Sequence, residues 1–270
     1  MKKTLFLTLV LLFPFVAEAA EVSYADLQDS TATAAQIRLG ADFDWRWNRV
    51  NLGLSEELRF NLMPAQEFYL ANTTAYVDVK IIRSYFHAHA GYQLRLRANK
   101  FGTANLTTGK LLRHRVFFGL TEHVKFGMYK QFTLSLRERA VLNMRFDDPN
   151  LYEKQAYAWE MRYRLQLQYK ALSLPLTPYV WTEIDHTCNA TDFQKYYNNG
   201  HNYITASKTA LGLKWKLNSN NTLNFFIRYD WTRDIDVDSN KLGTIVKQAI
   251  QEKQHAVILG VNYNFGYKKR

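Results

Sequence analysis

The segment Tyr157-Ala-Trp-Glu-Met-Arg-Tyr-Arg-Leu-Gln-Leu-Gln-Tyr169 decides the fold of this chain. Its odd positions are apolar or aromatic, and its even positions are mostly charged or amide residues. A period of two is typical of a β-strand with one apolar and one polar face. The segment is longer than the ~5–6 residues of an average soluble strand and long enough for the ~9–11 residues that a tilted strand needs to cross a bilayer. It therefore indicates a membrane-spanning strand.

The same alternation returns along the rest of the chain. It is clearest in residues 37–47, 50–60, 86–97, 223–231 and 257–267. Trp and Tyr gather near the ends of these segments, as in the aromatic girdles of membrane barrels. The pattern predicts an all-β protein, a single transmembrane antiparallel up-and-down β-barrel.

Connection lengths give the topology of this predicted barrel. Short connections near residues 48, 81–83, 127–130, 171–175 and 218–221 alternate with mostly longer ones near 61–65, 98–110, 146–153, 187–201 and 233–253. Bacterial barrels have short periplasmic turns, longer outer loops and an even number of strands. Eleven strands are evident, and Val22 to Gln28 is the candidate for one more. We therefore predict twelve strands with both termini in the periplasm, or ten if the segment 176–186 and a neighbour are misread. The connection 187–201, with Tyr196 and Tyr197, either dips into the lumen or stands outside it.

The N-terminus has the order of a secretory signal peptide. Lys2 and Lys3 precede an apolar stretch that ends in Ala17-Glu-Ala19. We predict a signal peptide over residues 1–19 and one barrel domain over residues 20–270, exported to the outer membrane. Removal of residues 1–19 takes two of the 35 basic and one of the 24 acidic residues, which leaves a net charge of +10. The single cysteine, Cys188, excludes a disulfide framework.

Basic residues dominate the polar face of the predicted strands. The candidates for an anion-facing lumen are Arg95, Arg97, Arg113, Arg115, Arg137, Arg139, Arg162 and Arg164. The acidic residues on the same face are fewer: Asp42, Asp44, Glu57, Asp78, Glu160 and Asp230. Rings of arginine in a pore favour the entry of anions. Alternatively, the arginines pair with carboxylates and fill the interior.

Three functions are compatible with the sequence. Two of them follow from the charge pattern of the lumen, and the third also needs a pair of catalytic side chains. The first is a structural or ligand-binding barrel with an Arg-rich lumen; the second is a porin-like, anion-favouring diffusion channel for small acidic solutes. The third is a rim hydrolase, which needs a His–Ser or His–carboxylate pair brought together across strands. Expected partners are outer-membrane lipid and lipopolysaccharide, small anionic solutes and the outer-membrane assembly machinery. Nucleic acid is not expected, because the protein is exported and its basic residues lie on strand faces.

A search for catalytic and metal-binding patterns gives little. No histidine is followed two positions later by serine, and no G-x-S-x-G occurs. Asp185 and His186 are adjacent and so point to opposite faces of a strand, which keeps them from activating one water together unless a bulge intervenes. We therefore predict no catalytic residue and no cofactor. His87 and His89 share a face and are weak candidates for a metal site, or else two polar residues in a hydrogen-bond network.

A recurring unit, in which a strand after a turn carries an acidic and often a basic residue, occurs at Leu52–Phe60, Phe118–Phe126 and Leu134–Arg139. On these motifs the chain resembles a family of uncharacterised outer-membrane β-barrel proteins of Gram-negative bacteria, known only as a domain of unknown function. The resemblance implies the fold and the membrane, and no activity. Within these units Glu56, Glu122 and Glu138 share the apolar face, so either a bulge turns them inward or they lie near the headgroups.

Overall fold

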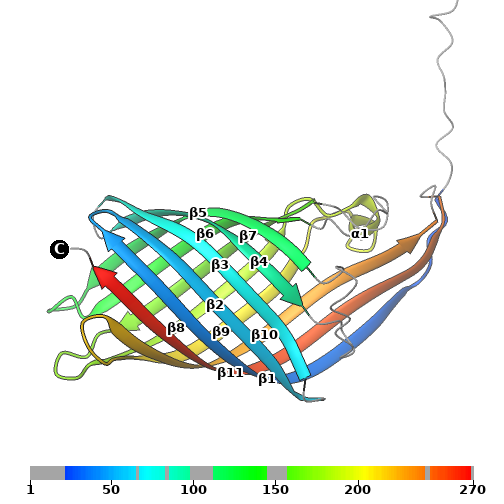
Figure 1. Cartoon of the computed structure of the whole chain (residues 1–270). Helices are drawn as coiled ribbons and strands as arrows, with labels where there is room; N and C mark the ends of the chain where they lie inside the picture. The colour runs from blue at the N-terminus through cyan, green and yellow to red at the C-terminus, as the bar shows by residue number, and fades with distance from the viewer. Residues whose placement is uncertain are drawn as a thin grey trace, which may run out of the picture.

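The computed structural model describes residues 22–64, 67–82, 85–97, 112–144, 157–240 and 244–268. Over these ranges the chain forms one closed β-barrel of eleven strands and a short helix (Figure 1). The elements in chain order are β1 Leu27–Trp47, β2 Val50–Met63, β3 Glu67–Ile82, β4 Phe86–Arg97, β5 Leu112–Phe126, β6 Phe132–Met144, β7 Tyr157–Tyr169, β8 Leu176–Thr187, α1 Asp192–Tyr196, β9 Ile204–Lys216, β10 Asn221–Ser239 and β11 Val246–Lys268. Within the described ranges no helix is long and apolar enough to traverse a bilayer.

The strand count differs from the predicted twelve, and from the alternative of ten. Residues 22–28 do not form a separate strand: Leu27 and Gln28 begin β1, and Ser23 makes only an isolated bridge with Ile245. Neighbouring strands pair antiparallel except at the closure, where β1 and β11 pair in parallel. Because an odd number of alternating strands leaves the first and last strands running the same way, only a parallel pairing can close this barrel. We call this pairing the β1–β11 seam.

The odd count also corrects the predicted placement of the termini. The described chain starts at Val22, at the end with the longer connections, and stops at Lys268, at the end with the short turns (Figure 1). The two ends of the described chain therefore lie on opposite sides of the barrel, and not together as predicted. Residues 1–21 lie outside the described ranges, so the signal peptide remains a prediction.

Alternation of exposed and covered side chains confirms the two-faced strands. In β2 and β7 successive residues switch between exposed and partly buried along most of the strand. Outward residues such as Leu54, Phe118 and Leu165 are 46%, 55% and 47% exposed. Inward residues are mostly polar, and many of them are buried. The apolar surface of this protein therefore faces outward, as a barrel in lipid requires.

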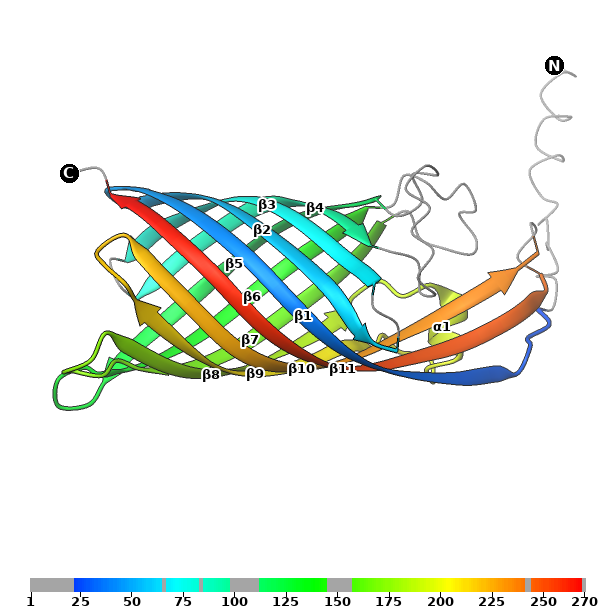
Figure 2. The same cartoon turned by 60° about the horizontal axis from the view of Figure 1, so that its bottom comes forward.

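Three strands continue beyond the barrel at the end with the longer connections. Most of the predicted loop over residues 233–253 is in fact strand: the last part of β10, up to Ser239, and the first part of β11, from Val246. With the first residues of β1 these strands form a protruding sheet, and α1 lies beside it (Figure 2). The sequence did not predict this, because its many charged and polar residues, such as Asp234, Asp236 and Lys253, are typical of a solvated loop.

The connection between β8 and β9 packs on this protruding sheet. The side-chain amide of Gln194 in α1 donates to the carbonyl of Ile235 at 3.0 Å, and the ring of Tyr196 stacks on Tyr24 with 3.6 Å between centroids. The Tyr197 hydroxyl donates to the carbonyl of Ala25 at 2.6 Å. Of the two predicted arrangements, a dip into the lumen or a position outside it, the contacts favour the second, because α1 packs on the part of the sheet that protrudes beyond the barrel.

Glu56, Glu122 and Glu138 all remain on the outer face. Each is exposed, and no register shift occurs at any of them. Thr73 donates to the Glu56 carboxylate at 2.8 Å. A bulge that turns them inward is therefore absent from the described strands.

Candidate functional site

The barrel encloses a cavity of about 1160 Å³. Among the described residues, fifteen basic and ten acidic side chains line it. The alternation of each strand explains this lining, because every second residue points inward. Two groups of ion pairs and one wall with unpaired arginines organise these charges.

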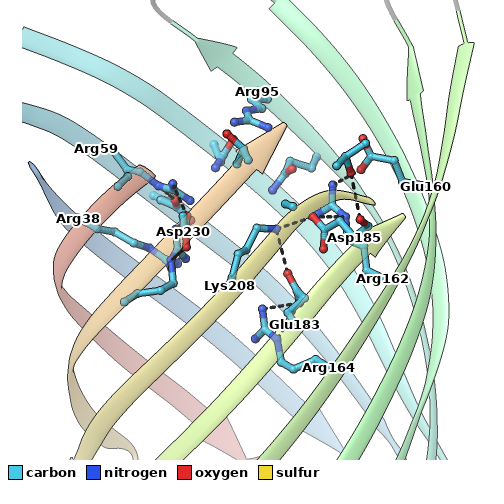
Figure 3. A pocket seen from close by; sticks show the side chains of 18 of the residues that line it. Arg38, Arg59, Arg95, Glu160, Arg162, Arg164, Glu183, Asp185, Lys208 and Asp230 are labelled. Carbon is cyan, nitrogen blue, oxygen red and sulfur yellow. Dashed lines mark hydrogen bonds and ion pairs between the residues drawn. The ribbon is translucent and has the colours of Figure 1, made fainter. Parts of the chain in front are cut away.

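The first group joins strands on either side of the seam. Arg38 Nη2 lies 2.9 Å from a Glu57 carboxylate oxygen, and Arg59 binds the same carboxylate. Arg59 also lies 3.7 Å from Asp230, to which Arg228 donates at 2.7 Å. Three cations thus share two carboxylates, with Arg38, Arg59 and Asp230 visible in Figure 3.

The second group has Glu183 at its centre. This carboxylate on β8 accepts from Arg164 at 2.7 Å, Arg137 at 2.9 Å and Lys208 at 3.1 Å. Its side chain is 4% exposed. Residues of β6, β7, β8 and β9 therefore meet at one buried anion, and we call them the Glu183 cluster.

Asp185, also on β8, extends the Glu183 cluster. Lys208 reaches it at 2.5 Å and Arg162 at 3.5 Å, and Arg162 also binds Glu160 at 2.8 Å. Figure 3 shows the Lys208 side chain between Glu183 and Asp185. The whole group counts four cations and three carboxylates, so it keeps a positive excess.

Arg115 and Arg139 differ from the other lumen arginines. Among the described residues neither has a carboxylate within ion-pair distance. Arg115 donates a 3.4 Å hydrogen bond to the Gln93 side chain, and its buried Nε has no hydrogen-bond partner in the described chain. The Arg139 guanidinium lies 4.2 Å from the centroid of the Phe117 ring and donates to His89 Nε2 at 3.2 Å. This wall of β5 and β6 presents positive charge to the cavity.

The structure places most of the predicted lumen arginines in this cavity. Seven of them line it: Arg95, Arg113, Arg115, Arg137, Arg139, Arg162 and Arg164. The side chain of Arg97 lies outside the described part of the structure. Their role toward anions stays a proposal.

The two histidines that are weak candidates for a metal site have different partners in the structure. His87 Nδ1 lies 2.9 Å from an Asp78 carboxylate oxygen, whereas His89 accepts from Arg139. The described residues contain no group of three or more His, Cys, Asp or Glu side chains suited to a metal ion. Cys188 is exposed with a free thiol.

Sequence reasoning missed the two carboxylates that hold the Glu183 cluster together. In the sequence the segment 176–186 is the least certain of the strands, and Asp185 stands out only beside His186. The parity of Val180, Thr182 and Ile184 outward against Trp181, Glu183 and Asp185 inward was the available signal. Asp185 faces the lumen, where it pairs with Arg162 and Lys208, and the β8–β9 register shifts between Asp185 and His186, so their opposite orientation stays a prediction.

Comparison with known proteins gives structural likeness at low sequence identity. No family model and no curated protein sequence matches the chain, so the resemblance to one particular barrel family stays a prediction. Among solved structures, the NanC porin is 13% identical, with coverage of 85% of this chain and 98% of that one and a TM-score of 0.45. Outer-membrane expressed OmpT of Vibrio cholerae is 12% identical, with coverage of 75% and 60% and a TM-score of 0.34. With identities this low, the likeness lies in the architecture alone.

Proposed function

We propose that this chain is an outer-membrane β-barrel whose arginine-lined lumen binds small anionic solutes. The observation that carries the proposal is the pair of lumen guanidinium groups, Arg115 and Arg139, without a carboxylate partner among the described residues. A buried cation without a counter-ion is costly, and a bound carboxylate or phosphate would relieve that cost. The apolar outer face supports a location in a bilayer.

A second candidate is an anion-favouring diffusion channel. The cavity lining supports it, because it runs from Ser30 and Glu252 in the protruding sheet to Arg46 and Asn264 near the short turns. The positive excess along this path would lower the barrier for anions. Both candidates depend on the wall that carries Arg115 and Arg139. They differ in whether ions pass through the lumen.

Reversal of the two unpaired charges tests both candidates. We expect inorganic phosphate to raise the unfolding temperature of the refolded native barrel, and Arg115→Glu with Arg139→Glu to abolish that rise. If the lumen conducts, the reversal potential of the native protein in a KCl gradient across a planar bilayer reports anion preference, which the double variant loses. Lys170→Glu, in a short turn outside the cavity, is the matched control and should change neither readout.

The outcomes separate the candidates. Phosphate stabilisation without conductance supports a binding barrel, and anion-selective conductance supports a channel. A folded, heat-modifiable barrel that shows neither would overturn the proposed function.

A substitution at Glu138, on the outer face of β6, tests whether the barrel lies in a membrane. A carboxylate on the lipid face is unfavourable, so Glu138→Leu should stabilise the barrel in lipid vesicles by about 1 kcal/mol. Urea titration measures the change, and Glu138→Gln should give part of it. A loss of stability in Glu138→Leu would argue that this face meets water or a partner protein.

A further inference from the structure

A serine and a histidine meet inside the barrel near the short turns. His123 on β5 and Ser135 on β6 lie directly opposite each other in the β5–β6 register. Ser135 Oγ is 2.7 Å from His123 Nδ1, and Ser135 is 6% exposed. When the hydroxyl donates to Nδ1, the neutral ring carries its proton on Nε2. A hydroxyl that donates to an imidazole nitrogen is the arrangement of a nucleophile and its general base.

A second pair lies beside the first. The ring of His87 on β4 meets that of His123 edge to face, with 5.0 Å between centroids. His87 Nδ1 in turn lies 2.9 Å from the Asp78 carboxylate on β3. Four neighbouring strands thus supply a carboxylate, two imidazoles and a hydroxyl in sequence. Asp78 contacts His87, the ring beside the base His123, and its negative charge favours an imidazolium at this place.

A hollow of about 220 Å³ opens next to this row of side chains. Ser135 and His123 line it together with Arg137 and Arg164. Both arginines also line the large cavity, so the hollow adjoins it. Guanidinium groups at such a position can stabilise an oxyanion. The hollow is smaller than the ~300 Å³ lower limit of typical ligand pockets and suits a short acyl group.

We propose that Ser135 and His123 form an acyl-transfer site that hydrolyses small carboxylic esters. The Ser135 oxygen bonds to the carbonyl carbon while its proton passes to His123 Nδ1, and the oxyanion faces Arg137 or Arg164. The carbon–alkoxide bond then breaks, and the alcohol leaves with the proton from His123. Water repeats these steps on the acyl-serine: its proton goes to His123, its oxygen bonds to the carbonyl carbon, and Ser135 leaves with that proton. The products are one acid and one alcohol.

This site goes beyond the proposed function, because it needs neither Arg115 nor Arg139. The sequence indicated only that a hydrolase needs a histidine and a serine or carboxylate brought together across strands, and it did not single out His123 and Ser135. The signal was the short turn at residues 127–131, which sets the β5–β6 register and brings His123 opposite Ser135.

The first test of the proposal is chemical labelling of the native barrel, and variants serve as its controls. A fluorophosphonate probe added to the refolded, heat-modifiable protein should form an adduct on Ser135, located by peptide mass spectrometry. His123→Gln should lower the labelling rate by about 100-fold or more. Ser55→Ala is the matched control, since Ser55 also faces the lumen but lies opposite Asp42 and Thr74.

Hydrolysis of p-nitrophenyl acetate gives the second readout. Ser135→Ala should abolish it, and Ser55→Ala should leave it unchanged. Asp78 is a positioning residue. Asp78→Asn should shift the acid limb of the pH profile of labelling and should also lower the amount of labelled protein. Absence of an adduct on Ser135 in the folded native barrel, or undiminished hydrolysis in Ser135→Ala, would overturn the proposal.

Discussion

Glu183→Leu will lower the free energy of unfolding of the barrel by about 3 to 5 kcal/mol, the largest effect that we expect from one lumen substitution. In the native protein this carboxylate is shared by Arg137, Arg164 and Lys208 at 2.7 to 3.1 Å. Its removal leaves two arginines without that partner in a cavity already rich in positive charge. Lys208 retains Asp185, at 2.5 Å.

Urea titration of the refolded variants in lipid vesicles, followed by tryptophan fluorescence, measures this loss. Glu183→Gln keeps the shape and should fall between native and leucine. In Glu183→Leu with Arg164→Met, one unpaired charge is removed and part of the stability should return. If Glu183→Leu changes the unfolding free energy by no more than the ~0.5 kcal/mol of a surface substitution, the ion pairs of the Glu183 cluster do not hold the barrel together.

Asp44→Ala should cost the barrel about 3 kcal/mol and loosen the β1–β11 seam. Asp44 is 5% exposed, and it accepts hydrogen bonds from Tyr76 at 2.6 Å, Asn51 at 3.0 Å and, across the seam, Asn264 at 3.0 Å. Asn262 of β11 likewise donates to Asp42 of β1. Parallel pairing is slightly weaker per residue than antiparallel pairing, and these amide–carboxylate contacts reinforce it from inside.

Hydrogen exchange followed by mass spectrometry distinguishes a loosened seam from general destabilisation. In Asp44→Ala, peptides from residues 40–47 and 260–267 should exchange faster than those of β5 and β6. Asp29→Ala is the control: Asp29 also accepts from Gln251 and Lys253 of β11, but its side chain is 60% exposed. Equal acceleration in all strands would contradict a specific role at the seam.

The local pattern predicted most of the strands and failed at their closure. Alternation is a property of each strand, so the segment 157–169 and its counterparts could be recognised one at a time. Which strands pair at the closure depends on the register between the two ends of the chain. After Leu27, the first residues of β1, Gln28 to Ala34, are small or polar on both faces. They gave no sign that they continue β1 beside β11.

The residues of the candidate sites also fall into a part that the sequence predicts and a part that it does not. The lumen arginines could be assigned from the alternation of odd and even positions, because this pattern depends only on the strand that carries each residue. The partners come from other strands: Glu183 binds Arg137 from β6 and Lys208 from β9, and Ser135 meets His123 across a hairpin. Such pairs follow only from cross-strand register, which the face pattern does not contain.

The parallel seam has a practical consequence for anyone who labels or fuses this protein. Since the described chain starts at Val22 at one rim and stops at Lys268 at the other, a tag before the first strand and a tag after the last would be displayed on opposite sides of a membrane that the barrel spans. One polypeptide could thereby carry a reporter for each compartment, which barrels with an even number of strands do not offer at their termini.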